Sequence, residues 1–191
     1  LADAAFFFSQ DKKHKLEERN EKLKNVVFQQ ELGSVYDKAQ RVKALAVAMA
    51  TSLNANKAYV ERAAELCKCD LATNMVYEFA ELQGIMGYHY ALHDGEAKEV
   101  ALALNEQYMP RFAGDAIAPS KLGQVLAIAE RLDTLAGGFA AGMKPTGNKD
   151  PFALRRNALG LARTLLEGDF NLRLDQLLGK AYLNVYEFCV T

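Results

Sequence analysis

Residues 70–112 read DLATNMVYEFAELQGIMGYHYALHDGEAKEVALALNEQYMPRF, and the rest of the chain is organised around this stretch. It contains two of the three histidines, and two of the three cysteines lie at or just before its start. Two glycines bound the short segment GIMG at 84–87, which predicts a local bend in the backbone. A functional pocket, if the protein has one, should be lined in part by residues 70–112.

Apolar side chains recur at helical spacing through this stretch. They predict a helix over residues 70–82 and a shorter helix over residues 84–92. The tripeptide HDG then predicts a turn, with Asp94 as the N-cap of a helix over residues 96–108 that Pro110 ends.

Helical patterns continue on both sides of the central stretch. Ser34 is predicted to cap one helix and Asp150 another, while Gly137 and Gly138 are predicted to stop the helix between them. The helices expected outside the central stretch cover residues 11–24, 35–53, 57–68, 120–136, 151–168 and 174 onward. Only residues 26–28 resemble a strand, and one short strand has no partner. The sequence therefore predicts an all-α domain of about eight helices.

Length and composition indicate a single soluble domain. The 191 residues are 50% hydrophobic and 25% charged, which is typical of a globular protein. Lys plus Arg (23) nearly balances Asp plus Glu (24), which argues against a strongly basic nucleic-acid-binding module and leaves room for a local basic face. No apolar run approaches the roughly 18 residues of a transmembrane helix, so no membrane partner is expected. The first residue is Leu1 rather than Met, and we expect a piece of a longer protein.

Cys67 and Cys69 form a Cys-x-Cys pattern, and Cys189 is far away in the sequence. A zinc site of the usual kind needs a second pair of ligands at a different spacing. We therefore expect structural thiols. Three cysteines cannot all pair within the chain, and with no secretory leader visible they favour the reducing cytoplasm.

His89 and His93 are four residues apart, which places two imidazoles on one helical face with Asp94 nearby. Two imidazoles and a carboxylate can hold a transition metal. The predicted turn at Asp94 interrupts the helix, however, and the sequence lacks the glutamate that follows the first histidine in metalloprotease helices. Packing or hydrogen bonding is the favoured role, and no metal is predicted.

Basic side chains gather around the sequence KDPFALRR, which ends at Arg156. Arg155 and Arg156 follow a glycine- and lysine-rich loop, and with Lys144 and Lys149 they could form a ridge suited to phosphate oxygens. The alternative is that one arginine pairs with an acidic neighbour such as Asp133 while the others are solvated. The sequence contains no phosphate-binding glycine loop and no hydrolase nucleophile motif, so no catalytic residue is predicted.

The blocks ELQGIMG at 81–87 and KDPFALRR at 149–156 carry a resemblance that continues in order along nearly the whole chain. Further segments that carry it are DAAFFFSQD, LKNVVFQQELGSVYDKAQRV, ALALNEQYMPRFAGD and AIAERLDTLAGGFAAG. These segments resemble the β subunit of the bacterial heterotetrameric glycyl-tRNA synthetase.

The resemblance implies that residues 1–191 form a single helical domain similar to HD (phosphohydrolase-like) domains, excised from the middle of that subunit. Residues 1–30 would be a connecting helix, and residues 170–191 would lead out to the C-terminal anticodon-binding region. The family's α subunit uses the ATP, Mg²⁺ and glycine, so no cofactor is expected in this piece. The expected partners are tRNA-Gly, the α subunit and the remaining β-subunit domains.

Working HD enzymes hold a divalent metal with a His, a His-Asp pair and a later Asp. By resemblance, these positions fall near Lys38, at Cys69 and Asp70, and near Glu130. A lysine and a cysteine stand where two histidine ligands are needed, so the metal site is expected to be degenerate and hydrolase activity lost. We expect Lys38 to occupy the place of the metal and to pair with Asp70 or Glu130.

Three functions are compatible with these patterns. The favoured one is a domain that contributes to tRNA recognition and subunit architecture in the ATP-dependent ligation of glycine to tRNA-Gly, without catalysis of its own. One alternative is an active metal-dependent phosphohydrolase that uses His89, His93 and Asp94 as ligands. The other is a structural spacer that docks through the phenylalanines at 6–8 and the apolar C-terminal segment.

Overall fold

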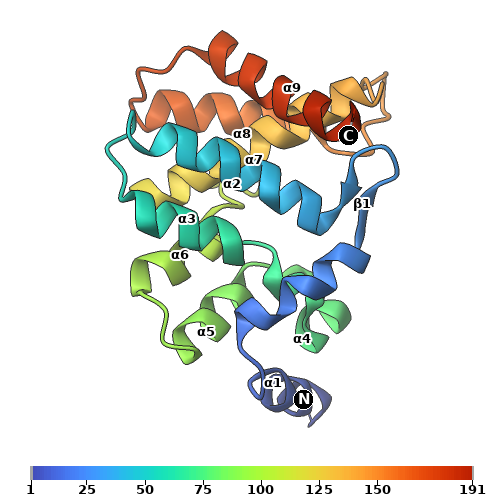
Figure 1. Ribbon diagram of the computed structural model, residues 1–191, viewed down its shortest axis with the longest axis vertical. Helices are drawn as coiled ribbons and strands as arrows, with labels where there is room; N and C mark the ends of the chain where they lie inside the picture. Colours follow the sequence, from blue (N-terminus) through green and yellow to red (C-terminus); the bar gives the residue numbers. More distant parts are fainter. Residues whose placement is uncertain (1, 191) are drawn as a thin grey trace.

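The computed structural model of the protein describes the backbone of residues 2–190 and the side chains of residues 3–188 (Figure 1). The α-helices of this part are α1 (Ala2–Asp11), α2 (Val35–Ala50), α3 (Lys57–Leu66), α4 (Asn74–Glu78), α5 (Ile85–His93), α6 (Lys98–Glu106), α7 (Lys121–Ala140), α8 (Leu154–Glu167) and α9 (Leu174–Val190). The shorter elements are the 3-10 turns η1 (Leu16–Arg19), η2 (Glu21–Asn25), η3 (Cys69–Ala72) and η4 (Ala80–Leu82) and the strands β1 (Val27–Gln29) and β2 (Gly33–Ser34). With 66% helix and 4% strand, the predicted all-α class is confirmed. None of the helices described combines the length and apolar character needed to span a bilayer.

Helix α7 is the centre of the fold. It packs against α2, α3, α6, α8 and α9. Figure 1 shows α8 and α9 above it and α3 and α6 below it. Leu126, Ile128 and Leu132 are fully buried, and the charged Arg131 and Asp133 of the same helix are buried as well. A helix that is covered on all sides needs apolar residues around its whole circumference, so the charges in the middle of α7 require partners inside the protein.

Asp11 joins the N-terminal segment to the central stretch. Its buried carboxylate accepts hydrogen bonds from the N–H groups of Asn74 and Met75 at 3.0 and 2.9 Å. The Tyr90 hydroxyl donates to it at 2.9 Å, and Arg19 forms an ion pair with it at 3.4 Å. A residue of α1 thus caps the N-terminus of α4 and anchors α5.

The predicted continuous helix over residues 70–82 is wrong. The turns η3 and η4 and the short helix α4 take its place. The Thr73 hydroxyl donates to the Asp70 carbonyl at 2.6 Å and accepts from the Val76 N–H at 3.2 Å, so it separates η3 from α4. Local side-chain bonds of this kind compete with a continuous helix.

The predicted helix over residues 11–24 is also wrong. The 3-10 turns η1 and η2 cover most of this segment, and its two leucines, Leu16 and Leu23, are fully buried. Asp94 does not cap the helix predicted at 96–108. Its carboxylate instead accepts a hydrogen bond from the Leu16 N–H at 2.6 Å, and α6 begins without a side-chain cap. A contact with a distant backbone group has replaced the local cap.

The prediction that Gly137 and Gly138 end α7 is wrong, because the helix continues to Ala140. A Cβ atom on Gly137 would lie 2.9 Å from a methyl group of Leu32. A Cβ atom on Gly138 would lie 2.8 Å from a methyl group of Leu154. The two glycines therefore let leucines pack directly on the backbone of α7.

Two helix starts involve the side chains predicted from the sequence. Ser34 caps α2 in a capping box with Asp37, as predicted. The prediction of Asp150 as the N-cap of a helix that begins at Pro151 is wrong in position, because α8 begins at Leu154 with Ala153 as its N-cap. The Asp150 carboxylate still accepts from the N–H groups of Leu154 and Arg155 at 2.7 and 2.9 Å. The strand expected to lack a partner has one, since β1 pairs antiparallel with β2.

The close approach of α6 and α7 depends on Gly123. A Cβ atom there would lie 2.6 Å from the Cβ atom of Glu106. We therefore expect Gly123→Ala to force the helices apart and to lower the free energy of unfolding by about 1–3 kcal/mol, despite the higher helix propensity of alanine. Gly179→Ala on α9 is the matched control, because open space surrounds its Cβ position, and it should stabilise by about 0.5–1 kcal/mol. Urea unfolding measures both changes, and equal changes would contradict the prediction.

Candidate functional site

Two helices bring opposite charges together inside the fold. The Lys38 ammonium on α2 lies 3.0 Å from the Asp133 carboxylate and 3.4 Å from the Glu130 carboxylate on α7. It also donates to the Thr134 hydroxyl at 2.8 Å. Arg41, one turn along α2, donates through Nε to Asp133 at 2.7 Å. Both cations are almost completely buried, so these pairs are shielded from water.

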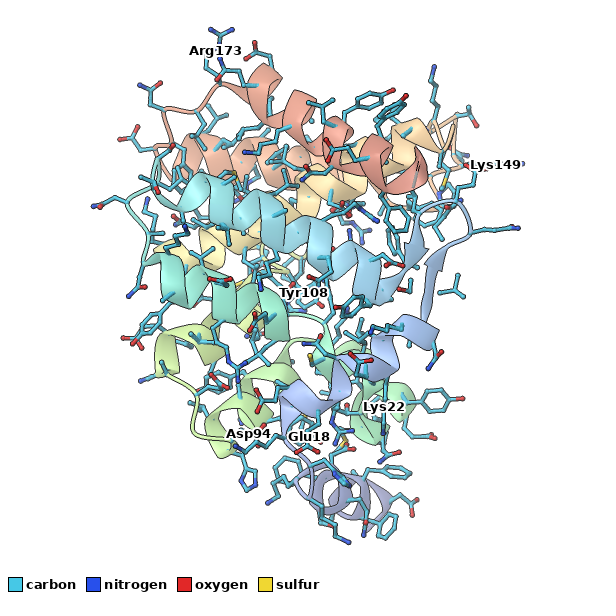
Figure 2. All side chains as sticks on the ribbon, viewed as in Figure 1. Glu18, Lys22, Asp94, Tyr108, Lys149 and Arg173 are labelled. Carbon is cyan, nitrogen blue, oxygen red and sulfur yellow. The ribbon has the colours of Figure 1, made fainter. Side chains whose placement is uncertain are left out.

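Lys68 extends this cluster from the segment that follows α3. Its ammonium lies 3.3 Å from the second carboxylate oxygen of Glu130 and donates to the Tyr108 hydroxyl at 3.1 Å. Gln83 also donates to that hydroxyl, at 2.7 Å. Figure 2 shows Tyr108 in the middle of the fold. We use the name buried ion cluster for Lys38, Arg41, Lys68, Tyr108, Glu130 and Asp133.

The lysines of the buried ion cluster keep its carboxylates ionised. Burial alone raises the pKa of Glu130, but the charges of Lys38 and Lys68 outweigh burial and bring this pKa to about 2. Burial alone would lower the pKa of Lys68, yet the charge of Glu130 and the hydrogen bond to Tyr108 raise it above its ordinary value. Burial raises the pKa of Tyr108, so its hydroxyl remains protonated.

Asp70 belongs to a different set of bonds. Its buried carboxylate accepts hydrogen bonds from the N–H groups of Gly84 and Gly87 at 2.6 and 3.2 Å. Gly84 has a φ of +82°, which favours glycine, and a Cβ atom on Gly87 would lie 3.2 Å from the Asp70 carboxylate. The glycines of the GIMG segment are therefore explained by their contact with Asp70. Burial raises the pKa of this carboxyl group.

Cys67 and Cys69 are buried free thiols. The Cys69 sulfur lies 3.6 Å from the Glu65 carbonyl oxygen, and burial raises the pKa of Cys67 to about 12. Both thiols therefore stay protonated near neutral pH, in keeping with the structural role predicted for them. The side chain of Cys189 lies outside the described residues.

The structure brings together two of the four positions at which a degenerate metal site was predicted. The expected contact of Lys38 with Glu130 is present, whereas Asp70 and Cys69 bond to other groups. Sequence reasoning missed Asp133 as a partner of Lys38. The signal was its spacing of three residues after Glu130, which places both carboxylates on one face of α7.

Within residues 3–188, no group of three His, Cys, Asp or Glu side chains is placed to hold a metal ion. His89 and His93 are both exposed on α5, where the His89 ring packs edge-on against Tyr88 at 5.0 Å. The Asp94 carboxylate is bonded to the backbone of Leu16. These three side chains therefore do not assemble into the ligand set that a phosphohydrolase would need.

Lys144, Lys149, Arg155 and Arg156 lie where α7 leads into α8, and we use the name basic ridge for them. Both lysines are exposed in the connecting loop, and Figure 2 shows Lys149 at the edge of the molecule. Arg155 donates to the Gly147 carbonyl at 2.8 Å, which holds the loop against α8. The exposed side chain of Arg156 makes no hydrogen bond or ion pair with the described residues.

The alternative pairing of Arg155 or Arg156 with Asp133 is wrong. Asp133 is 1% exposed, and both of its oxygens already face cations of α2. The carboxylate closest to the basic ridge in sequence, Asp150, is occupied by the first N–H groups of α8. The four cations of the basic ridge therefore keep their charge available to a ligand in solution.

A family model described as Glycyl-tRNA synthetase beta subunit matches residues 1–189. The chain belongs to this glycyl-tRNA synthetase beta subunit family. The resemblance seen in the ELQGIMG and KDPFALRR blocks is thereby confirmed.

Curated relatives carry the same description. The chain is 62% identical over 178 residues to "Glycine--tRNA ligase beta subunit" of Xanthomonas campestris pv. campestris (strain B100), which covers 93% of this chain and 26% of the relative. It is 58% identical over 175 residues to the protein of that name from Pseudomonas fluorescens (strain Pf0-1), which covers 92% of this chain and 26% of the relative. The chain spans about a quarter of the length of the curated relatives it matches.

The substitution Lys38→Met tests whether the buried ion cluster stabilises the fold of this member of the beta subunit family. The substitution leaves each buried carboxylate of α7 with one cation fewer, and removing one partner of a buried pair costs about 3–5 kcal/mol. Lys43→Met is the matched control on the same helix, because Lys43 pairs with Glu65 at the surface and should cost at most about 1 kcal/mol. Urea unfolding compares the two, and similar losses would rule out a stabilising role for the cluster.

The depressed pKa of Glu130 predicts a pH dependence of stability. This pKa is about 2 in the folded protein, below the value of 4.5 for an ordinary Glu. The stabilisation is therefore fully present above pH 4.5 and is lost as the pH falls toward 2. Between these values, Glu130→Gln should show a shallower fall in the free energy of unfolding than the unsubstituted protein. Urea unfolding across this pH window provides the measurement, and parallel curves would exclude Glu130 as the titrating group.

Proposed function

We propose that this chain is a helical domain of the β subunit of a glycine–tRNA ligase, and that it contributes to tRNA recognition and subunit architecture in the ATP-dependent ligation of glycine to tRNA-Gly. Its family membership and the names of its relatives support the assignment to the ligase. The observation that carries the tRNA contact is the basic ridge, whose four exposed cations have no carboxylate partner among the described residues.

The basic ridge has the chemistry of a phosphate-binding surface. Ammonium and guanidinium groups bind phosphate oxygens and release the counterions of the nucleic acid. Phosphate contacts position an RNA but carry no sequence information. Because Asp150 already occupies the N-terminus of α8, the side chains of the ridge, rather than the helix end, supply the attraction.

We further propose that the fold is similar to HD domains, with the buried ion cluster in place of their metal. Support comes from the two lysines beside Glu130, since Lys38 and Lys68 flank both of its oxygens. Ammonium groups then fill the space that a divalent cation would need. Such a set of side chains does not fit a metal ion, and no catalytic role is assigned to it.

The proposed setting is the cytoplasm, in an assembly with the α subunit, the remaining β-subunit domains and tRNA-Gly. In this proposal the α subunit binds ATP, Mg²⁺ and glycine, and this chain needs no cofactor. The relatives support the presence of further domains, because each is about four times as long as the segment that matches this chain.

A scaffolding role is supported by a second observation. An apolar groove of about 640 Å³ lies between α7, α8 and α9, and the exposed Leu178 and Tyr182 of α9 line it. At the other end of the chain, Phe6 is exposed on α1. Exposed apolar patches of this kind mark surfaces that pack against other domains. The chain can therefore serve as a scaffold and contact tRNA at the same time.

The basic ridge is tested by Lys144→Ala/Lys149→Ala in the full-length β subunit assembled with its α subunit. Two lost phosphate contacts should raise the KM for tRNA several-fold and reduce the slope of log Kd against log salt by about one to two. The kcat should change little, because the ridge is not placed at a catalytic group.

Lys15→Ala/Lys22→Ala is the matched control, since it removes the same charge from two exposed lysines. Figure 2 shows Lys22 and Lys149 in different parts of the molecule. This variant should leave the KM and the salt dependence unchanged. Equal effects of the two double substitutions would mean that the lysines of the ridge act only through the net charge of the protein. No effect of either would exclude the ridge from the tRNA interface.

A further inference from the structure

A groove of about 470 Å³ separates the segment at 110–114 from α8. Phe112 and Leu159 both line this groove and are 64% and 67% exposed. Arg156 and Arg163 of α8 line it as well. The groove thus combines an exposed aromatic ring with two guanidinium groups, and its volume lies in the usual range of ligand pockets.

The segment at 110–114 is held in place by Arg131 of α7. The guanidinium of Arg131 donates at 3.1–3.3 Å to three backbone carbonyl groups, those of Gln107, Tyr108 and Pro110. The N–H of Arg111 donates to the Asp115 carboxylate at 2.7 Å, which closes the segment into a turn. The ring of Phe112 is therefore presented to solvent from a fixed backbone.

The groove has an excess of positive charge. Arg131 is buried, and none of its hydrogen bonds reaches a carboxylate in the described part of the chain. Arg156 is unpaired among the same residues, and Arg163 shares its charge with Glu167 at 2.7 Å. A smaller cavity of about 120 Å³ beside the groove is lined by Arg111, Arg131 and Arg156.

The carboxylates near the groove are already engaged. Asp115 accepts two backbone N–H groups at 2.7 and 2.9 Å. Glu130, which borders the smaller cavity, is held by Lys38 and Lys68. An anion that enters the groove therefore meets Arg156, which has no carboxylate partner among the described residues, and Arg163, whose charge Glu167 and Asp115 balance in part.

We propose that this groove binds one unpaired nucleotide of single-stranded RNA, with its base against Phe112 and its phosphate at Arg156. Bases stack on aromatic side chains, and guanidinium groups bind phosphate oxygens, so the pair of side chains matches both parts of a nucleotide. Bases inside an RNA duplex are covered by their neighbours and present no free face to Phe112. The proposal rests on the proposed function, in which RNA is the ligand.

The groove and the basic ridge meet at the first turn of α8. Successive helical residues point about 100° apart, and of the two arginines of the ridge only Arg156 also lines the groove. Arg155 bonds to the loop carbonyl of Gly147, whereas Arg156 lines the groove. An RNA strand whose backbone follows the ridge can therefore place its next unpaired nucleotide in the groove.

The first test measures tRNA affinity of the complete α- and β-subunit enzyme by fluorescence anisotropy. Phe112→Ala should weaken binding by roughly five- to 150-fold, the range for the loss of one base stacked on an aromatic ring. The matched control is Tyr77→Ala, which removes another highly exposed aromatic ring, on α4, and should leave the affinity unchanged. Because Phe112 is exposed, both variants should fold, which thermal unfolding verifies.

The second test uses the absence of tryptophan from this sequence. Phe112→Trp keeps an aromatic face and adds a local fluorophore. Its emission is measured as the difference between the fluorescence of the variant and that of the unsubstituted enzyme. Its emission should be quenched by tRNA and by a single-stranded oligoribonucleotide, and should be unaffected by a blunt-ended RNA duplex. Tyr77→Trp, as the control, should respond to none of the three.

The outcomes separate this proposal from the proposed function. Unchanged tRNA affinity of Phe112→Ala with no quenching in Phe112→Trp would refute the nucleotide groove. Weaker binding of Lys144→Ala/Lys149→Ala would then leave the basic ridge in place, and unchanged binding would remove the RNA contact altogether. Quenching by duplex as strong as by single strand, or by free nucleoside monophosphates alone, would also overturn an unpaired RNA nucleotide as the occupant.

Discussion

The charged turn in the middle of α7 imposes the constraint on which the rest of the fold depends. A helix that packs against five others has no wet face to which charges can turn, so each charge must be compensated inside the protein. Glu130 and Asp133 meet this demand with cations from α2 and from the segment after α3. An uncompensated buried charge costs several kcal/mol. Other registers of α2 on α7 are therefore strongly disfavoured, and the ion pairs define the arrangement of the helices as well as holding it.

Arg131 is another buried charge of α7 that needs partners inside the protein, and these partners lie in a segment at the surface. It lies next to Glu130 in the sequence but points to another side of α7, where backbone carbonyl groups of the turn before Phe112 take its N–H groups. A Cβ atom on Gly160 would lie 2.5 Å from its Nε atom, so a glycine is what allows α8 to come this close. One buried side chain thus positions both walls of the groove. Backbone carbonyl groups and the charge of the neighbouring Glu130 offset its charge, and none of its hydrogen bonds reaches a carboxylate of the described residues.

Local patterns predicted those elements whose boundaries are set locally. Ser34 caps α2 within its own first turn, and helical periodicity located α3, α5, α6 and α7. The local bonds of Thr73 interrupt the segment at 70–82. In addition, the side chains of Asp11 and Asp94 bond to backbone groups of the segments at 70–82 and 11–24 that lie far away along the chain. Such a contact depends on the completed tertiary structure, and no window of neighbouring residues contains it. The four-residue spacing of His89 and His93 indicated a possible metal site on one helical face. In the fold this face is exposed, and no third ligand among the described residues completes the site.

The sequence predicted the part of the candidate site in which charged residues are close together along the chain. It did not predict the part that forms only when helices pack together. The basic ridge is visible as four cations within a short segment, whereas Phe112 is an ordinary loop residue until α8 packs beside it. The net charge of −1 argued against a strongly basic module, and the distribution of charge in the structure is compatible with the proposed RNA contact. Many carboxylates form ion pairs in other parts of the protein. Glu17 and Glu96, for example, both pair with Arg62. In physiological salt, screening limits the electrostatic effect of the excess positive charge around the ridge and the groove to a distance of about 8–10 Å. In the proposed function, a nearly neutral domain would therefore attract RNA only where the backbone and an unpaired base fit these surfaces together, and its selectivity would come from their geometry rather than from net charge.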